Sequence, residues 1–172
     1  MRIAVIGATG MVGGEVVAEA LGRGHQLTAV SRRIGETAPD AKPTPDAKPT
    51  PANPDPAPGP DVTRVALDVA SGERLHPVIA DADAVVLAVR LSAGEEHRLA
   101  ALTHGVLDAV AASGTRLLVV GGSAPLLCPD GSGRRAIEDP QRVPPAWQAI
   151  AVLDELEVPS GEQHLTVAAS LA

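Results

Sequence analysis

Short apolar runs alternate with stretches of helical periodicity along most of the chain. The apolar runs predict strands at residues 2–6, 26–31, 62–68, 84–90 and 115–120. The periodic stretches between them predict helices at residues 11–23, 72–80 and 95–112. Parallel strands need a crossover connection, usually a helix, so this alternation is typical of a parallel sheet covered on both faces. We therefore predict an α/β fold, a Rossmann-type doubly wound parallel sheet in three layers, αβα.

Three segments carry this pattern most clearly. Residues 84–90 are apolar almost throughout, as expected for a strand that is buried on both faces. The helix predicted at 95–112 has one apolar face, and Gly114 follows as a stop signal. That face consists of Leu99, Leu102, Val106 and Val110. The corresponding face of the helix at 11–23 consists of Val12, Val16, Ala20 and Leu21. We expect both faces to pack against the sheet.

A glycine-rich turn joins the first predicted strand to the first helix. Gly7 permits a tight turn, Gly10 lets a phosphate approach the backbone, and Gly13 lets the helix lie close to the strand. The unpaired amides and the positive end of the helix dipole would then face a dinucleotide pyrophosphate. The candidate cofactor-binding residues of this turn are Gly7, Ala8, Thr9, Gly10, Met11, Val12 and Gly13. The alternative is a plain strand–turn–helix connection.

The second predicted strand ends in Ser31, Arg32 and Arg33. In this kind of fold the end of that strand meets the adenosine ribose, where an acidic residue favours NAD and a basic residue favours the 2′-phosphate of NADP. A guanidinium can bind a phosphate through two hydrogen bonds. These residues therefore predict NADP rather than NAD as the cofactor. The alternative is that both arginines are solvated loop charges.

Polar residues also follow the third and fourth predicted strands. Asp68 and Val69 come beside the expected adenine position, where Asp68 either accepts a hydrogen bond from the adenine amine or caps the following turn. Ala88, Val89 and Arg90 end the fourth strand, where the ligand crevice of such sheets lies. Arg90 would face a cofactor phosphate or a substrate anion there, or point into solvent.

Gly121 and Gly122 follow the fifth predicted strand. Paired glycines let the backbone lie close to a ligand, here on the nicotinamide side. Ser123, next in the chain, is the one candidate catalytic residue, since its hydroxyl could bond a substrate carbonyl. The alternative is a turn that leads into a loop.

The composition removes one common mechanism. Carbonyl reduction on this fold often uses a Tyr as acid with a nearby Lys, yet the chain has no Tyr, and its only lysines are Lys42 and Lys48. Hydride transfer would therefore rest on the cofactor itself, with water as the proton source. The histidines are scattered and do not pair with Cys128 at ligand spacing, so we expect no metal site.

Charge and cysteine content restrict partners and compartment. The net charge of −7 argues against nucleic acid as a partner. The lone Cys128 suits a reducing cytoplasm, no segment resembles a signal peptide, and no apolar stretch is long enough to span a membrane. We expect a cytoplasmic protein with a small-molecule acceptor that the sequence does not identify.

A Pro-rich insert separates the second and third predicted strands. Nine of the 16 prolines lie between Pro39 and Pro60, and a hexapeptide, Asp-Ala-Lys-Pro-Thr-Pro, occurs twice in tandem. Such a segment buries little and cannot form a helix, so we expect disorder at about residues 35–60. It is either a tolerated surface expansion or a docking segment for a protein partner. The rest predicts a single NAD(P)-binding domain over residues 1–172.

The motifs together resemble one known family. They are the turn at 7–13, the segment 31–33, Asp68-Val69, the segment 83–86 and the segment 120–122. They are similar to those of atypical short-chain dehydrogenases/reductases, in particular the NAD(P)H-binding proteins near the NmrA-like proteins and the biliverdin/flavin reductases. In those relatives the last motif continues Gly-Gly-Ala-Gly-Ser-Leu. Here Pro125 stands at the place of that Ser.

The carboxyl-terminal part resembles the family less closely. Residues 137–147 resemble the loop after the fifth strand, 149–157 the last helix, and 165–168 the terminal strand. The segment that lies between that loop and that helix in relatives, with a further strand and substrate-covering loops, is absent. The resemblance therefore implies a cofactor-binding core with a shortened substrate region.

Three functional hypotheses follow. The first is an NADPH-dependent oxidoreductase that transfers hydride to a small or planar acceptor such as a flavin or quinone. The second is a non-catalytic, NADP-binding regulatory protein of the NmrA type, which would act on a protein partner. The third is a decayed paralogue without activity.

Overall fold

Five parallel strands form one sheet in the order β3-β2-β1-β4-β5. The computed structural model describes residues 1–32, 34, 56–57, 59–69, 75–91, 94–121, 133 and 145–161. The strands are β1 (Arg2–Ile6), β2 (Gln26–Ser31), β3 (Val62–Ala66), β4 (Ala84–Leu87) and β5 (Arg116–Val119). The strand order reverses direction between β1 and β4, as in a doubly wound fold. This topology confirms the predicted Rossmann-type α/β class.

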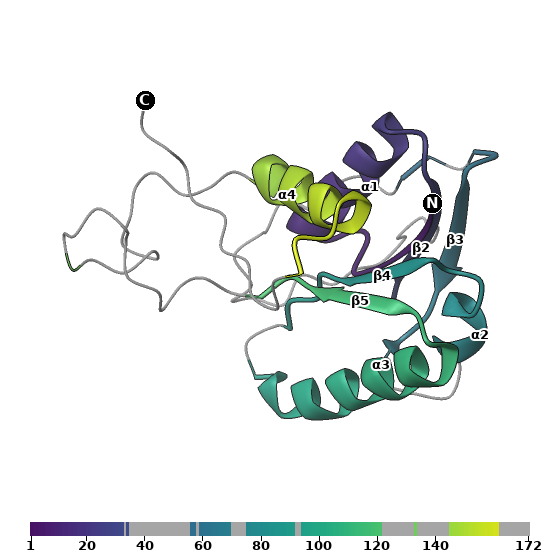
Figure 1. The fold of residues 1–172 in the computed structure, drawn as a ribbon. Helices are drawn as coiled ribbons and strands as arrows, with labels where there is room; N and C mark the ends of the chain where they lie inside the picture. The colour runs from purple at the N-terminus through teal and green to yellow at the C-terminus, as the bar shows by residue number, and fades with distance from the viewer. Residues whose placement is uncertain are drawn as a thin grey trace.

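Helices cover both faces of the sheet. They are α1 (Met11–Gly22), α2 (Leu75–Ile79), α3 (Leu99–Ser113), which follows the 3-10 turn η2 (Glu96–Arg98), and α4 (Pro145–Glu157). Figure 1 shows α1 and α4 together on one face and α2 and α3 on the other. The three-layer arrangement is therefore also confirmed. No described helix is long and apolar enough to cross a membrane.

The core is aliphatic and lies on both sides of the sheet. Strand β1 is buried from Ile3 to Ile6 because its side chains alternate between the two faces. Ile3 and Val5 pack with the α1–α4 layer, whereas Ala4 and Ile6 pack with the α2–α3 layer. Strand β4 is buried throughout its length, as its continuous apolar run predicted.

Strands β3 and β4 end at least two residues earlier than predicted. Strand β4 stops at Leu87 rather than Arg90, and β3 stops at Ala66 rather than Asp68. The register explains both ends. Leu87 pairs with Ile6, after which β1 turns away, and Ala66 pairs with Ser31, the last residue of β2. The strand ends therefore form one carboxyl edge, and the candidate residues after β3 and β4 lie in connections.

The prediction of a single helix over residues 95–112 was partly wrong. Its first turn is the 3-10 turn η2, and α3 begins at Leu99 and ends at Ser113. Leu99 is 51% exposed because it occupies the first turn after η2, and the buried stripe starts at Leu102. That stripe continues through Val106 and Ala109, and Val110 is only partly buried.

The face of α1 differs slightly from the prediction. Val16 and Ala20 are buried as predicted, Val17 is buried in addition, and Val12 and Leu21 are only partly buried.

The last described helix confirms the resemblance in part. Helix α4 starts at Pro145, four residues before the predicted 149–157. A proline at the first helical position loses nothing, because its missing amide would have no acceptor there. The predicted terminal strand at 165–168 and nearly all of the Pro-rich insert lie outside the described residues, and the single-domain boundaries stay a prediction.

Candidate functional site

The glycine-rich turn closes tightly at the carboxyl end of β1. Gly7 has a φ of 91°, a region that L side chains rarely adopt. The amides of Gly7 and Ala8 both donate to the Val30 carbonyl, at 2.9 and 3.1 Å, and the Gly10 amide donates to the Gly7 carbonyl at 2.9 Å. These bonds attach the turn to β2 and fold it back on itself, so its shape is set by the backbone.

Each glycine of the turn faces neighbouring backbone. A Cβ at Gly7 would lie 2.5 Å from the Ala88 carbonyl oxygen, and a Cβ at Gly13 would collide with the Gly7 carbonyl. Gly7 and Gly13 therefore act as predicted, in the tight turn and in close packing. A Cβ at Gly10 would lie 3.1 Å from the Gly7 carbonyl oxygen, so Gly10 also contributes to the turn's packing. Its predicted role toward a phosphate stays a prediction.

Helix α1 begins directly after this turn, with Gly10 as its N-cap. No side chain of the described residues caps the helix, and its first ladder bond runs from the Gly14 amide to the Gly10 carbonyl at 2.8 Å. Residues 11–13 form the first turn of α1, whose amides precede that bond and lie at the positive end of the helix dipole. The uncapped start and the turn without carboxylates suit a pyrophosphate, so the residues present fit a dinucleotide.

The end of β2 lies beside this turn. The hydroxyls of Thr9 and Ser31 are 2.8 Å apart and form a hydrogen bond between the turn and the strand end. Arg32 follows immediately, and its side chain is 48% exposed. Its Nη1 lies 3.8 Å from Oε1 of Glu95. The structure thus brings Arg32 next to the predicted adenosine position, while Arg33 lies outside the described residues.

A charged cluster continues from Arg32 across the same edge of the sheet. Arg98 in η2 donates to Glu95 at 3.0 Å and to Asp68 at 2.7 Å. These two carboxylates raise the pKa of the Arg98 guanidinium, Asp68 having the larger effect. Asp68 therefore has a partner that neither sequence interpretation included. We call Arg32, Asp68, Glu95 and Arg98 the edge cluster.

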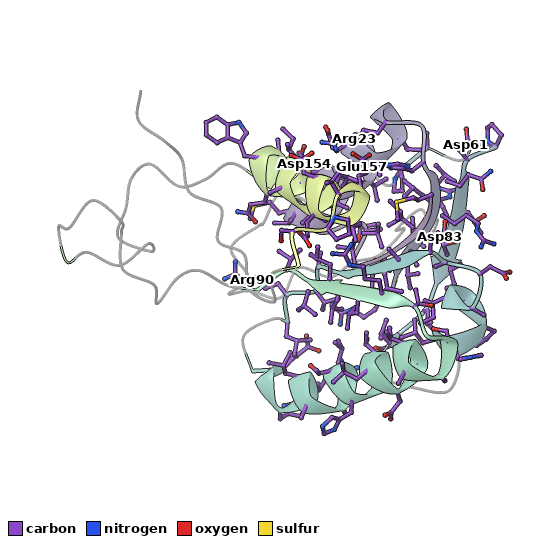
Figure 2. The ribbon with its side chains drawn as sticks, viewed as in Figure 1. Arg23, Asp61, Asp83, Arg90, Asp154 and Glu157 are labelled. Carbon is purple, nitrogen blue, oxygen red and sulfur yellow. The ribbon has the colours of Figure 1, made fainter. Side chains whose placement is uncertain are left out.

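The remaining candidates occupy different environments. Val69 is buried in the core between the sheet and the α2–α3 layer. The Ala88 amide donates to the Ile6 carbonyl at 2.9 Å, so the backbone after β4 lies against the glycine turn. Val89 is partly buried, whereas Arg90 is exposed and bonds no described residue. Figure 2 shows Arg90 well apart from Arg23, Asp154 and Glu157.

Of the candidates after β5, only Gly121 is described, and it is exposed. Gly122 and the candidate catalytic Ser123 lie outside the described residues.

Neither Glu95 nor Arg98 was predicted from the sequence as a site residue. Both come between β4 and α3, and their spacing of three residues is that of a helical ion pair. This local pattern was the available signal, although the contact with Asp68 joins residues 30 apart in the chain. Among the described residues, no three His, Cys, Asp or Glu side chains are arranged to hold a metal.

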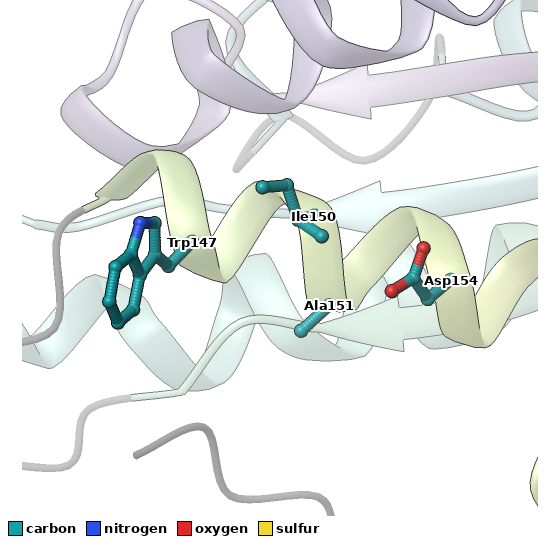
Figure 3. A pocket seen from close by; sticks show the side chains of 4 residues that line it. All are labelled: Trp147, Ile150, Ala151 and Asp154. Atoms are coloured by element: carbon teal, nitrogen blue, oxygen red, sulfur yellow. The ribbon is translucent and has the colours of Figure 1, made fainter. Parts of the chain in front are cut away.

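A shallow depression lies on α4. It has a volume of about 280 Å³, and its lining residues are Trp147, Ile150, Ala151 and Asp154. They occupy one face of a single helix (Figure 3), so the hollow is open to solvent. It contains none of the turn or edge-cluster residues, and we do not assign the cofactor to it.

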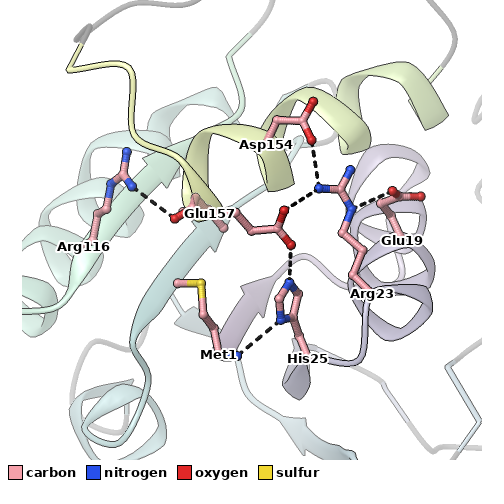
Figure 4. A network of polar contacts seen from close by, with 8 residues as sticks. Met1, Glu19, Arg23, His25, Arg116, Asp154 and Glu157 are labelled. Carbon is pink, nitrogen blue, oxygen red and sulfur yellow. Dashed lines mark hydrogen bonds and ion pairs between the residues drawn. The ribbon is translucent and has the colours of Figure 1, made fainter.

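A second polar network connects α4 to α1 (Figure 4). Arg23, which follows α1, donates to Glu19, Asp154 and Glu157 at 2.8 Å each. His25 Nε2 donates to the other Glu157 oxygen at 2.8 Å, since a carboxylate can only accept. The bond from His25, followed by the one from Arg23, lowers the pKa of Glu157. This network is a structural connection between helices.

Comparisons with known proteins agree with this geometry. Residues 7–143 match a protein family described as NAD(P)H-binding. The uncharacterized protein YwnB of Bacillus subtilis is 30% identical over 144 residues, which cover 82% of this chain. The chain spans 56% of the length of YwnB.

Solved structures share the fold. The Lmo0794 protein of Listeria monocytogenes is 26% identical with a TM-score of 0.60, and the match covers 93% of this chain and 94% of that one. A Lactobacillus casei protein reaches a TM-score of 0.64 with the same coverage of 93% and 94%. Its identity is 20%, so this likeness concerns the fold alone.

Proposed function

Because this chain belongs to the NAD(P)H-binding family, we propose that it is an oxidoreductase whose hydride donor is a nicotinamide dinucleotide. The observation that carries the proposal is the turn at 7–13. It places the uncapped start of α1 at the carboxyl end of β1, beside β4, where the strand order reverses. Ligands of doubly wound sheets bind at that point.

The chain's own residues would bind and orient the cofactor. The amides at the start of α1 would hold the pyrophosphate, and Arg32 after β2 would meet the adenosine ribose. The opposite end of the cofactor would then lie toward the ends of β4 and β5, near Val89, Arg90 and Gly121. Arg32 favours a 2′-phosphate, so we propose NADPH as the preferred cofactor.

The cofactor would supply the redox chemistry, since the nicotinamide ring itself transfers hydride. The chain has no Tyr to donate a proton. An acceptor that needs no protein acid, such as a flavin or quinone, suits this composition best. The protein would hold the two rings in reach of each other.

The missing Tyr also favours a second function, a non-catalytic NADP-binding regulatory protein. Such a protein would need the turn at 7–13 and Arg32 but no proton donor. It would change the activity of a protein partner when the cofactor binds, and the Pro-rich insert would contact that partner.

The test is NADPH oxidation with a panel of flavins and quinones. The oxidoreductase proposal predicts turnover by the wild type and, for Arg32→Gln, a lower rate at subsaturating NADPH but an unchanged rate with NADH. The unchanged rate with NADH is the control, because a damaged fold would lower the rate with both cofactors. NADPH binding without oxidation by any acceptor would favour the regulatory function, and absence of binding would contradict both.

A further inference from the structure

The edge cluster shares one carboxylate between two arginines. Oε1 of Glu95 lies 3.0 Å from Nη1 of Arg98 and 3.8 Å from Nη1 of Arg32. Arg98 has a second carboxylate, Asp68, at 2.7 Å. The four residues come from three segments: the end of β2, the residues after β3, and the segment that contains η2. Two positive and two negative charges thus meet at one edge of the sheet.

The two arginines are held differently. Arg98 donates to both carboxylates at hydrogen-bonding distance, and its side chain is 30% exposed. Arg32 is 48% exposed, and its distance to Glu95 exceeds that of a hydrogen bond. Arg32 is therefore the guanidinium that an incoming anion can reach, and Glu95 is the carboxylate it must approach.

We infer that Glu95 is a specificity-determining residue that limits the preference for NADPH over NADH. This inference rests on the proposed function. A 2′-phosphate carries nearly two negative charges, so Glu95 repels it and competes with it for Arg32. NADH has a hydroxyl at that position and meets neither effect. The wild type therefore discriminates between the two cofactors less than Arg32 and Arg98 alone would allow.

The test compares dissociation constants of NADPH and NADH for the wild type and Glu95→Gln. The variant keeps the size of the side chain and removes its charge. We expect the affinity ratio, NADPH over NADH, to rise by about three- to tenfold, the range for one partly exposed charge interaction. Asp108→Asn is the control, because it removes one exposed negative charge on α3 outside the cluster, and its ratio should equal that of the wild type.

Two further variants separate specificity from a structural role. If Glu95 competes for Arg32, the rise in the ratio caused by Glu95→Gln should be smaller in an Arg32→Gln background, where only the direct repulsion is left to remove. Arg98→Gln should lower the ratio, since it frees Glu95 to pair with Arg32, and it keeps the test open if Glu95→Gln does not fold. If Glu95 only supports η2, Glu95→Gln should weaken the binding of both cofactors equally.

The results of these binding experiments test the role of Glu95 separately from the proposed function. A higher ratio in Glu95→Gln, with a smaller rise in the Arg32→Gln background, supports the inference. If the wild type binds either cofactor but Glu95→Gln leaves the affinity ratio unchanged, the role of Glu95 is overturned. The proposed function is not affected by that result. No binding of either cofactor by the folded wild type overturns both.

Discussion

At the scale of single residues, the space around Gly13 determines whether the turn and α1 fit together. The backbone of the turn already fills the position that a side chain would occupy, because the Gly7 carbonyl lies there. Gly7 itself has the positive φ that a tight turn needs. Two glycines are thus required by contacts within the protein, before any ligand is considered.

We predict that Gly13→Ala lowers the free energy of unfolding by about 3 kcal/mol, because the new methyl group must displace backbone. The matched control is Gly22→Ala in the same helix, where nothing lies within 4 Å of the new Cβ. That change should leave stability unchanged or raise it by up to about 1 kcal/mol. Urea unfolding measures both, and equal stabilities for the two variants would contradict the packing account.

The residues that sequence could predict are those whose partners are close in the chain. The roles of Gly7 and Gly13 follow from their spacing within one turn. The partner of His25 is Glu157, which lies 132 residues away, and the partner of Asp68 is Arg98, 30 residues away. The local sequence pattern does not connect residues that are so far apart in the chain. Such pairs can therefore be identified only when the fold is known.

At the scale of elements, α4 packs against α1 and against the same face of the sheet. Ala149, Leu153 and Leu156 are buried, whereas Trp147 and Ile150 on the other face are exposed. Arg116 on β5 adds a polar link, since it donates to the Glu155 carboxylate at 2.7 Å and to the Glu155 carbonyl at 3.0 Å. Helix α4 therefore depends on one apolar face and on contacts near its end.

We predict that Leu153→Ala lowers the free energy of unfolding by about 2–5 kcal/mol, because it leaves a cavity between α4 and its neighbours. Leu153 is fully buried, whereas Ile150 is 41% exposed in the same helix. Ile150→Ala is therefore the control and should cost less than about 1 kcal/mol. Thermal unfolding of both variants measures the difference, and a cost for Ile150→Ala that matches that of Leu153→Ala would show the faces to be wrongly assigned.

The His25–Glu157 contact predicts a pH dependence. The pKa of Glu157 is lowered in the folded protein from its ordinary value of 4.5. The contact therefore stabilises the fold above that pH, and the contribution is lost as the pH falls through the lowered pKa. Glu157→Gln should lose less stability than the wild type in this acid range. Glu15→Gln, on α1 outside the network, should follow the wild type in denaturant titrations across pH, and identical slopes for all three would contradict the prediction.

Element positions were predicted better than element ends. The starts of β1, β2 and β4 follow from their apolar runs and agree with the structure. The end of β4 does not, because Ala88 and Val89 remain apolar although the pairing with β1 ends at Leu87 and Ile6. The length of a strand depends on its pairing with neighbouring strands. The apolar pattern of a single strand does not predict where that pairing ends.

At the scale of the whole molecule, the strand order brings the ends of all five strands to one edge. The glycine turn, Arg32 and the edge cluster lie there, although they come from distant parts of the sequence. The alternation of strands and helices was enough to predict this architecture, because each element has an apolar face that it buries in a layer of this kind. The core of the described residues consists mainly of aliphatic side chains on both faces of the sheet. The sequence did not predict that η2 would carry a second arginine to the same edge.

Our proposal rests above all on the binding of a nicotinamide dinucleotide by the turn at 7–13. The most direct test is the melting temperature of the wild type with and without saturating NADPH or NADH. Binding to the native state stabilises it by about 2.7 kcal/mol at a hundredfold excess over the dissociation constant, or roughly 5–10 °C for a chain of this length. We predict a clear rise with NADPH and a smaller rise with NADH. A cooperative melting transition that neither cofactor shifts would contradict the claim.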